Sequence, residues 1–207
     1  MQPNDLLTSP IVKPTLIHKL TSIIERLDLE KMFAAKQGLE VELGSGDGSF
    51  LANYAKLHPE RNFIGIERLL GRLRKLDRKG LRADLNNLRV LRIESAYFVE
   101  YLLPQQSVAA LHVYFPDPWP KRKHRKNRLI NEHFTKIAHT ALAPEGMVFL
   151  RTDDEDYFTQ MVTVFAGNPG FRLVETPEEL TAVVTDFERT FQARGVKTLR
   201  AAYTKVG

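Results

Sequence analysis

The sequence predicts an α/β fold in which a doubly wound, mostly parallel sheet carries helices on both faces. Short apolar runs alternate with segments of helical periodicity along most of the chain, a pattern typical of strand–helix–strand units. A glycine-rich turn follows an early apolar run, where folds of this class place a ligand. The 207 residues, 43% of them hydrophobic, suit a single domain over residues 1–207.

The first half of the chain is expected to alternate as follows. Residues 1–13 form a flexible N-terminal arm. A helix over 14–27 is expected because Pro14 suits a first turn and one helical face collects the apolar residues Leu16, Leu20, Ile23, Ile24 and Leu27. Then come a strand ending at Leu43, a helix from about Asp47 that stops before Pro59, a strand over 62–67, and a basic helix to about Leu85, interrupted near Gly80.

The second half continues the alternation. Strands are expected over 88–93, 107–115 and 147–153, with a helix from about 129 to 142 between the last two. A helix to about Phe165 follows, then the strand "FRLVE" and a closing strand within "VKTLRAAYTKV". Neither repeats nor an interdomain linker interrupt this order.

Composition narrows the classes of protein. The absence of cysteine excludes disulfides, thiolate metal sites and cysteine nucleophiles, and no metal is expected. No apolar run is long enough to span a bilayer and no signal peptide is recognisable, so the expected location is the cytoplasm. The net charge of +5, with nine Lys or Arg against two Asp between residues 68 and 92, points to a polyanionic partner.

The turn "VELGSGDGSF" carries Gly44, Gly46 and Gly48 between a strand and a helix. Glycine tolerates positive φ and lets a ligand approach the backbone, so three alternating glycines favour a cofactor loop over a plain tight turn. Glu67 ends the next strand 23 residues after Gly44, where such folds place the acid that binds ribose hydroxyls. A solvated glutamate at the end of that strand is the alternative.

The spacing of the turn discriminates between cofactors. Asp47 stands at the expected helix start, where a pyrophosphate would be repelled, and the third glycine is too close for the dinucleotide pattern. A cofactor with a positive sulfonium and no phosphate fits better, which indicates S-adenosylmethionine. Glu42 could reach the amino-acid end of that cofactor or simply point outward from its strand, and the spacing alone leaves both open.

The segment "FPDPWPKRKHRKNRL" follows the fourth strand. Asp117 lies between two prolines that fix φ, which suits a carboxylate held beside a reactive centre. Trp119 could stack on a base or cation, but core packing is the commoner use of a lone tryptophan. The run from Lys121 to Arg128 holds six Lys or Arg and cannot be mostly buried. It is either a solvated face or a rim that binds phosphates of a nucleic acid.

Five segments together carry a resemblance: "ELGSGDGSFL", "NFIGIE", "YFPDPWPKRKHRKNRLI", "RTDDEDY" and "TDFER". They resemble the bacterial tRNA (guanine-N7)-methyltransferase family from about residue 40 to about residue 190. The element around Asp117 is the most specific of them. The resemblance implies a seven-stranded, Rossmann-like methyltransferase fold that uses S-adenosylmethionine to form 7-methylguanosine in the tRNA variable loop.

The resemblance also implies roles by position. Cofactor contacts fall on Glu42, Glu67, Glu94 and Asp117, beside the Gly44–Gly46 turn, with Asp117 also catalytic. Contacts to tRNA or guanine fall on Lys121, Asp153, Thr185, Asp186, Phe187 and Glu188. Glu94 and Ser95 replace the family's usual Asp-Ala, and Asn127 replaces a usual basic residue. A helix cap is the alternative role for Asp153, and Thr185 with Glu188 has the spacing of a capping box.

Other functions remain open at this point. A nicotinamide-dependent oxidoreductase would share the glycine turn and Glu67, and a non-catalytic RNA-binding module would explain the basic segments. A methyltransferase for another RNA, a protein or a small molecule is a further alternative. The tRNA enzyme is the leading hypothesis, as a monomer or a homodimer.

Overall fold

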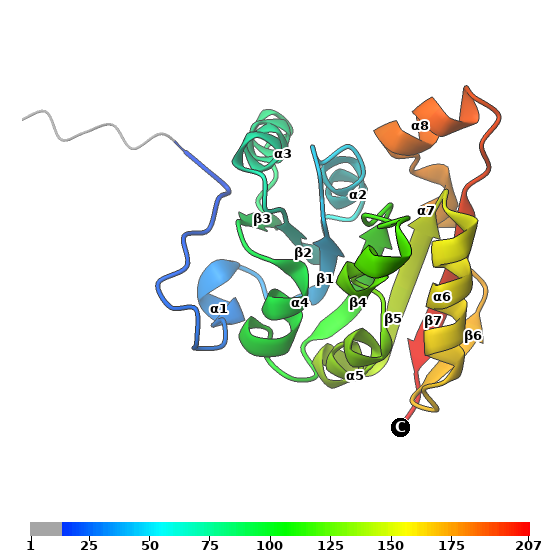
Figure 1. Cartoon of the computed structure of the whole chain (residues 1–207). Coiled ribbons are helices and arrows are strands. Elements are labelled where there is room, and N and C mark those ends of the chain that lie inside the picture. Colours follow the sequence, from blue (N-terminus) through cyan, green and yellow to red (C-terminus); the bar gives the residue numbers. More distant parts are fainter. Residues whose placement is uncertain (1–13) are drawn as a thin grey trace, which may run out of the picture.

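The computed structural model describes residues 14–207, so the arm expected over residues 1–13 lies outside the described residues. Seven strands form one sheet in the order β3-β2-β1-β4-β5-β7-β6 (Figure 1). They are β1 Gly38–Leu43, β2 Arg61–Ile66, β3 Leu88–Leu91, β4 Val108–Tyr114, β5 Leu142–Thr152, β6 Phe171–Val174 and β7 Leu199–Lys205. The first five strands pair in parallel and β7 is antiparallel to both neighbours, which confirms the predicted fold class.

Helices cover both faces of the sheet (Figure 1). They are α1 Leu29–Met32, α2 Leu51–Leu57, α3 Leu70–Arg82, α4 Ser95–Tyr97, α5 Glu132–Ala141, α6 Glu155–Ala166, α7 Glu178–Ala182 and α8 Asp186–Gln192. A π-helix η1 spans Phe98–Leu102 and a 3-10 helix η2 spans Arg122–Asn127. The chain winds outward from β1 to β3 and then crosses to β4 on the other side of β1, so the loops after β1 and β4 open on one crevice.

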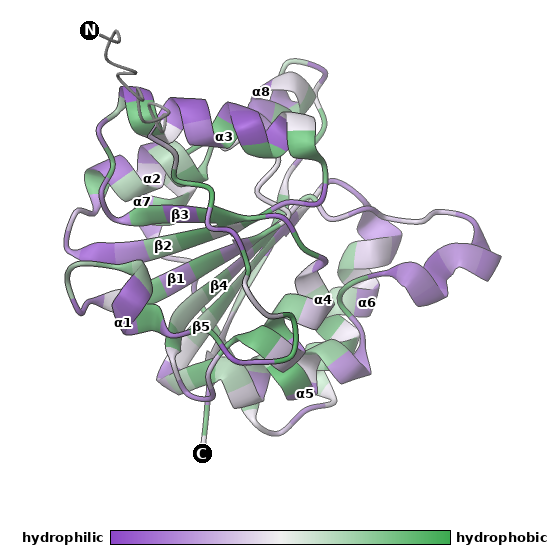
Figure 2. Ribbon diagram, turned by 90° about the vertical axis from the view of Figure 1, so that its left-hand side faces the viewer, coloured by the Kyte–Doolittle hydropathy of each residue, from purple (hydrophilic) through white to green (hydrophobic). Residues whose placement is uncertain are grey.

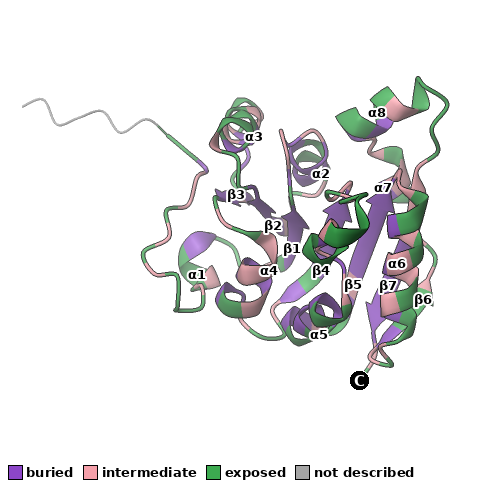
Figure 3. Ribbon diagram, viewed as in Figure 1, coloured by how far each residue is buried: buried purple, intermediate pink, exposed green. Residues whose placement is uncertain are grey.

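Alternation along the strands divides the core into two clusters. Val41 and Leu43 of β1 face the cluster that contains Phe134 of α5 and Met161 of α6, while Phe63 of β2 faces α2 and α3 on the other side. The strands are apolar and buried through the centre of the molecule (Figures 2 and 3). Because both faces are covered, even the polar residues of the central strands are buried and need internal partners.

One buried polar network meets this need on β1 and β4. His112 is completely buried and lies with Nε2 2.7 Å from Glu40 Oε2 and Nδ1 2.8 Å from the Tyr114 hydroxyl. Arg61 donates from 2.9 Å to the other Glu40 oxygen. The network fixes the hydroxyl group of Tyr114, and Tyr114 lines the crevice described below.

The helix predicted over 14–27 is wrong. Residues 16–18 of this segment lie extended beside β3, where Val90 donates to Leu16 O at 3.0 Å and His18 donates to Val90 O at 2.9 Å, and the chain bends at residues 23–25. The pairing satisfies backbone groups that the sheet edge would otherwise leave open. Ile23 and Ile24, counted in the apolar face, are 60% and 82% exposed.

Two predicted helix boundaries also shift. The helix after the glycine turn begins at Leu51 rather than near Asp47, because Gly44, Gly46 and Gly48 all have positive φ. Helix α3 continues through Gly80 without interruption. A Cβ at Gly80 would lie 2.4 Å from Leu16 Cδ1, so this glycine lets the extended segment pack on the helix.

Within residues 14–207, no helix has the length and apolar character that crossing a membrane requires. Among the same residues, no three His, Asp or Glu side chains are arranged to hold a metal ion.

Replacement of Gly48 by alanine should destabilise the protein. The new Cβ would lie 2.3 Å from Leu76 Cδ1 at a residue with φ of 78°, so packing and backbone both oppose it. We expect a loss of about 1–3 kcal/mol in the free energy of unfolding, measured by urea denaturation. Gly71→Ala is the control, because nothing lies within 4 Å of its Cβ position and alanine favours a helix. Equal unfolding midpoints for Gly48→Ala and wild type would contradict the packing argument.

Candidate functional site

A pocket of about 680 Å³ lies at the carboxyl ends of the central parallel strands. Each of four loops contributes a residue that the sequence singled out: Gly44 after β1, Glu67 after β2, Glu94 after β3 and Asp117 after β4. The crevice position follows from the crossover between β1 and β4. These four residues, up to 73 positions apart in the chain, therefore line one pocket.

Glu42 lies on β1 beneath the glycine turn and is only 4% exposed. It is therefore not an outward strand residue, which removes one of the two alternatives that its spacing left open. Burial raises the pKa of its carboxyl to about 8, while the Arg151 guanidinium acts in the opposite direction. Its Oε2 atom has no hydrogen-bond partner among the described residues. A buried acceptor without a donor is costly, so this carboxyl is suited to a ligand that brings one.

The acidic residues after β2 and β3 differ in how they are used. Glu67 is 7% exposed and its Oε1 accepts from the Leu69 amide at 2.7 Å, which orients the side chain and leaves a second oxygen. Glu94 caps α4, with its two oxygens accepting from the amides of Ala96 and Tyr97 at 3.0 and 2.7 Å. Both Glu94 oxygens thus have a local partner, although each retains a further lone pair.

The loop around Asp117 is held in an unusual backbone conformation. Phe115 and Trp119, two residues to either side, have φ of 51° and 44°, and non-glycine residues rarely adopt such values. Strain of this kind costs on the order of 1–3 kcal/mol per residue and persists only where the surroundings impose it. Trp119 is 37% exposed and lines the pocket, so the interpretation that it packs in the core is wrong.

Arg128 anchors this loop through the carbonyl oxygen of Pro118. Although it ends the basic run, it is 2% exposed, and its Nε donates to Pro118 O at 2.7 Å. Its other nitrogens donate to Gln160 and Asp156 of α6 at 2.9 and 2.6 Å. The preceding residues of the run, Lys121 to Asn127, are exposed apart from the half-buried His124. One cation therefore anchors the loop while the others face solvent.

The predicted substrate residues divide into two groups. Thr185 and Glu188 form the capping box of α8, and Glu188 is completely buried. Its oxygens accept from Arg151 and Arg200, each at 2.8 Å. The structure thus places both residues in a helix cap and not on the pocket wall. Asp186 and Phe187, between them, are exposed.

Among the other predicted substrate residues, Phe187 contacts the lining of the pocket. Phe187 stacks on Phe115, with ring centroids 6.2 Å apart, and Phe115 lines the pocket. Asp154 rather than Asp153 caps α6, since Asp154 accepts from the Tyr157 amide at 2.7 Å. Asp153 is half-buried just after β5. Lys121 is exposed at the start of η2 and does not line the pocket.

Sequence reasoning missed Arg151. It is 1% exposed on β5, stacks 4.1 Å from the Tyr114 ring centroid, and donates to Val183 O at 3.0 Å. With its bond to Glu188, it ties the segment of α7 and α8 to the sheet beside the pocket. A charged residue inside the apolar run "MVFLRTD" was the available signal.

Comparison with known proteins identifies the family of the chain. Residues 36–201 match a family model described as "Putative methyltransferase". A tRNA (guanine-N(7)-)-methyltransferase of Chromohalobacter salexigens is 39% identical over 74% of this chain and 62% of its own length. The protein of the same description from Thermotoga maritima is 32% identical over 87% of this chain and 58% of its own length. The one from Rubrobacter xylanophilus is 32% identical over 82% of this chain and 77% of its own length. The chain thus spans about three fifths of the first two.

Solved structures support the fold. The 16S rRNA methyltransferase KamB superimposes with a TM-score of 0.63 at 16% identity, over 88% of this chain and 95% of its own. TrmN from Thermus thermophilus gives a TM-score of 0.59 at 18% identity, over 86% of this chain and 47% of its own. At such identities the likeness concerns the fold, whereas the sequence matches confirm the predicted resemblance. The chain belongs to the bacterial tRNA (guanine-N7)-methyltransferase family.

Proposed function

We propose that this protein transfers a methyl group from S-adenosylmethionine to N7 of a guanosine in the variable loop of tRNA, forming 7-methylguanosine. The observation that carries the proposal is the pocket that Gly44, Glu67 and Asp117 line together beside an exposed cationic segment. The printed names of the relatives support the choice of base and of RNA. A tRNA substrate would place the protein in the cytoplasm, as a monomer or a homodimer.

The residues present fit S-adenosylmethionine. When bound, it supplies an electrophilic methyl group on a positive sulfonium. Glu67 would accept from the ribose hydroxyls with the oxygen that Leu69 does not use. The Oε2 atom of Glu42 would accept from the ammonium group of the amino-acid end, which is the donor that this buried carboxyl lacks among described residues. Gly44 and Gly46 would allow close approach to the backbone, and Glu94 would accept from the adenine amino group through a remaining lone pair.

Guanine N7 carries an in-plane lone pair and no proton, so the reaction requires no base to activate it. The purine becomes positively charged as it accepts the methyl group. Asp117, fixed by its prolines and by the anchored Pro118 carbonyl, would orient the base and stabilise this charge. Alignment of the two reactants supplies much of the remaining acceleration, about 7–11 kcal/mol in well-oriented systems.

The tRNA would lie across the rim of the pocket. Lys121 and the exposed cations after it would contact phosphates, which gives strong and salt-dependent binding. Phe187, stacked on Phe115, offers an aromatic face to the guanine, and Asp153 an acceptor for its N–H groups. Asp186 lies beside Phe187 at the exposed start of α8. Thr185 and Glu188 would act indirectly, by holding α8 in place.

Asp117→Asn should abolish most of the methyl transfer. The variant keeps the shape of the side chain but removes the charge that would stabilise the cationic purine, so we expect kcat to fall by about 100- to 1,000-fold. The assay incubates unmodified tRNA with methyl-labelled S-adenosylmethionine and locates the labelled base after digestion. Glu175→Gln, at an exposed glutamate after β6, should retain full activity. Label on another base, or an active Asp117→Asn variant, would refute the assignment.

Glu42 should make cofactor binding pH-dependent. Its pKa is raised to about 8 in the free protein, mainly by burial, and an ammonium partner would favour the charged form. Binding at neutral pH should therefore release a proton, and affinity for S-adenosylmethionine should rise between about pH 6 and 7.5. Above this range the ligand's own amino group, with a pKa near 8, begins to lose its charge.

Calorimetry in buffers of different ionisation enthalpy measures this proton release directly. Glu42→Gln should bind more weakly and lose the pH dependence. A wild-type affinity that stays constant over the range would show that Glu42 does not contact the ammonium group.

A further inference from the structure

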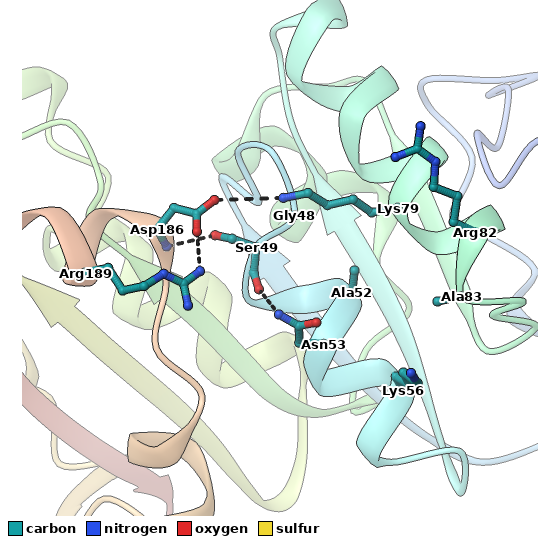
Figure 4. A pocket seen from close by; sticks show the side chains of 10 residues that line it. All are labelled: Gly48, Ser49, Ala52, Asn53, Lys56, Lys79, Arg82, Ala83, Asp186 and Arg189. Atoms are coloured by element: carbon teal, nitrogen blue, oxygen red, sulfur yellow. Dashed lines mark hydrogen bonds and ion pairs between the residues drawn. The ribbon is translucent and has the colours of Figure 1, made fainter.

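A second pocket, of about 380 Å³, lies between α2, α3 and α8 and shares no lining residue with the larger one (Figure 4). Its charged and amide side chains come from all three helices: Asn53 and Lys56 of α2, Lys79 and Arg82 of α3, and Asp186 and Arg189 of α8. Four of these six side chains are cationic and one is acidic. A concave surface with this excess of positive charge suits an anion.

The carboxylates nearby neutralise only some of these cations. Lys79 Nζ lies 3.0 Å from Asp47 Oδ2. It also lies 4.0 Å from Asp186 Oδ2, and Arg189 pairs with Asp186 (Figure 4). No carboxylate among the described residues forms an ion pair with Lys56 or Arg82, both of which are exposed. The acids hold two of the cations in place, and the other two are left for a ligand.

Helix α3 connects the two pockets. Leu73, Leu76 and Gly80 are buried against the core, and the opposite face is hydrophilic (Figure 2). Arg72 lines the larger pocket, and Lys79 and Arg82 line the smaller one. Positions 79 and 82 are about 10 and 15 Å along the helix axis from Arg72. A stacked strand that rises about 3.4 Å per nucleotide covers this distance in about three to five nucleotides.

We propose that this second pocket binds a backbone phosphate of the tRNA, about three to five nucleotides from the guanosine that is methylated. The assignment rests on the proposed function for the identity of the RNA and of the target base. Lys56 and Arg82 contact the phosphate directly, and Lys79 and Arg189 add charge from fixed positions. The RNA strand follows the basic face of α3 from one pocket to the other. A separate small phosphate ligand would not require this continuity of cations.

The first test is the salt dependence of tRNA binding to the double variant Lys56→Gln/Arg82→Gln. Loss of one phosphate contact should weaken binding several-fold near 0.1 M salt and reduce the slope of log K against log salt by about 0.7 to 0.9. The value of kcat at saturating tRNA and the affinity for S-adenosylmethionine should not change.

The control Lys136→Gln/Arg172→Gln removes the same charges from exposed positions on α5 and β6 and should keep the wild-type slope. An unchanged slope in the test variant, or an equal loss in the control, would overturn the proposal.

The second test removes the charge from the RNA instead. A tRNA with a neutral methylphosphonate linkage, placed in turn at each position three to five nucleotides from the target guanosine, should bind wild type more weakly at one position. The same linkage should have no further effect on the double variant, because the two changes remove one interaction. Independent, additive losses would show that the pocket does not contact that phosphate.

The two proposals fail in different ways. If the double variant shows the predicted slope change relative to wild type but wild type forms no 7-methylguanosine, the proposed reaction is wrong and the phosphate pocket stands. If 7-methylguanosine forms normally while the slope and the methylphosphonate results show no role for Lys56 and Arg82, the pocket assignment is wrong and the reaction stands.

Discussion

The loop that carries Asp117 depends on the burial of a single guanidinium. The cost of removing Arg128 from water is offset because its nitrogens donate to Pro118, Gln160 and Asp156, and because its Cζ atom lies 4.7 Å from the Tyr157 ring centroid. Removing one partner of such a buried charge typically costs 3–5 kcal/mol. Two left-handed residues cost about 1–3 kcal/mol each, so the loss on breaking this anchor is of the same order as the strain in the loop. The strained loop, its carboxylate and the exposed cations after it are thus positioned together against α6.

A second buried guanidinium, that of Arg151, connects the lining of the pocket to the cap of α8. Arg151 lies between Tyr114 on the pocket floor and Glu188 in the cap of α8, and it also favours the charged form of Glu42. The same side chain therefore borders the proposed cofactor site and supports the segment that presents Phe187. Because the capping box of α8 includes Glu188, any movement of this helix would disturb the surroundings of Arg151. The sites proposed for the two substrates share one electrostatic support.

Sequence patterns were most informative where a local rule and the tertiary structure agree. The parallel strands are mostly apolar because both of their faces are covered, and the glycines after β1 are needed for positive φ, so both features were readable in advance. The grouping of Gly44, Glu67, Glu94 and Asp117 followed from the rule that parallel strands end at one edge.

The errors arose where long-range contacts decide the outcome. Residues 16–18 pair with the β3 edge, although their apolar spacing is helical, because the open edge of a distant strand offers backbone partners that local spacing does not reveal. Nothing local distinguishes Arg128 from the solvated cations before it, since its partners lie on α6, about 30 residues further on. Capping-box spacing did identify Thr185 and Glu188, but not the arginines that bury Glu188.

The position of β7 has a consequence for biosynthesis. Among the seven strands it is translated last, yet it lies between β5 and β6 and is the only sheet neighbour of β6. On the ribosome, β5 would therefore wait with one open backbone edge until nearly fifty further residues had been added after its end. Exposed strand edges recruit other chains, so nascent copies of this protein would be vulnerable to association until β7 docks. Chaperone dependence during synthesis would then reflect strand order rather than low stability of the finished fold.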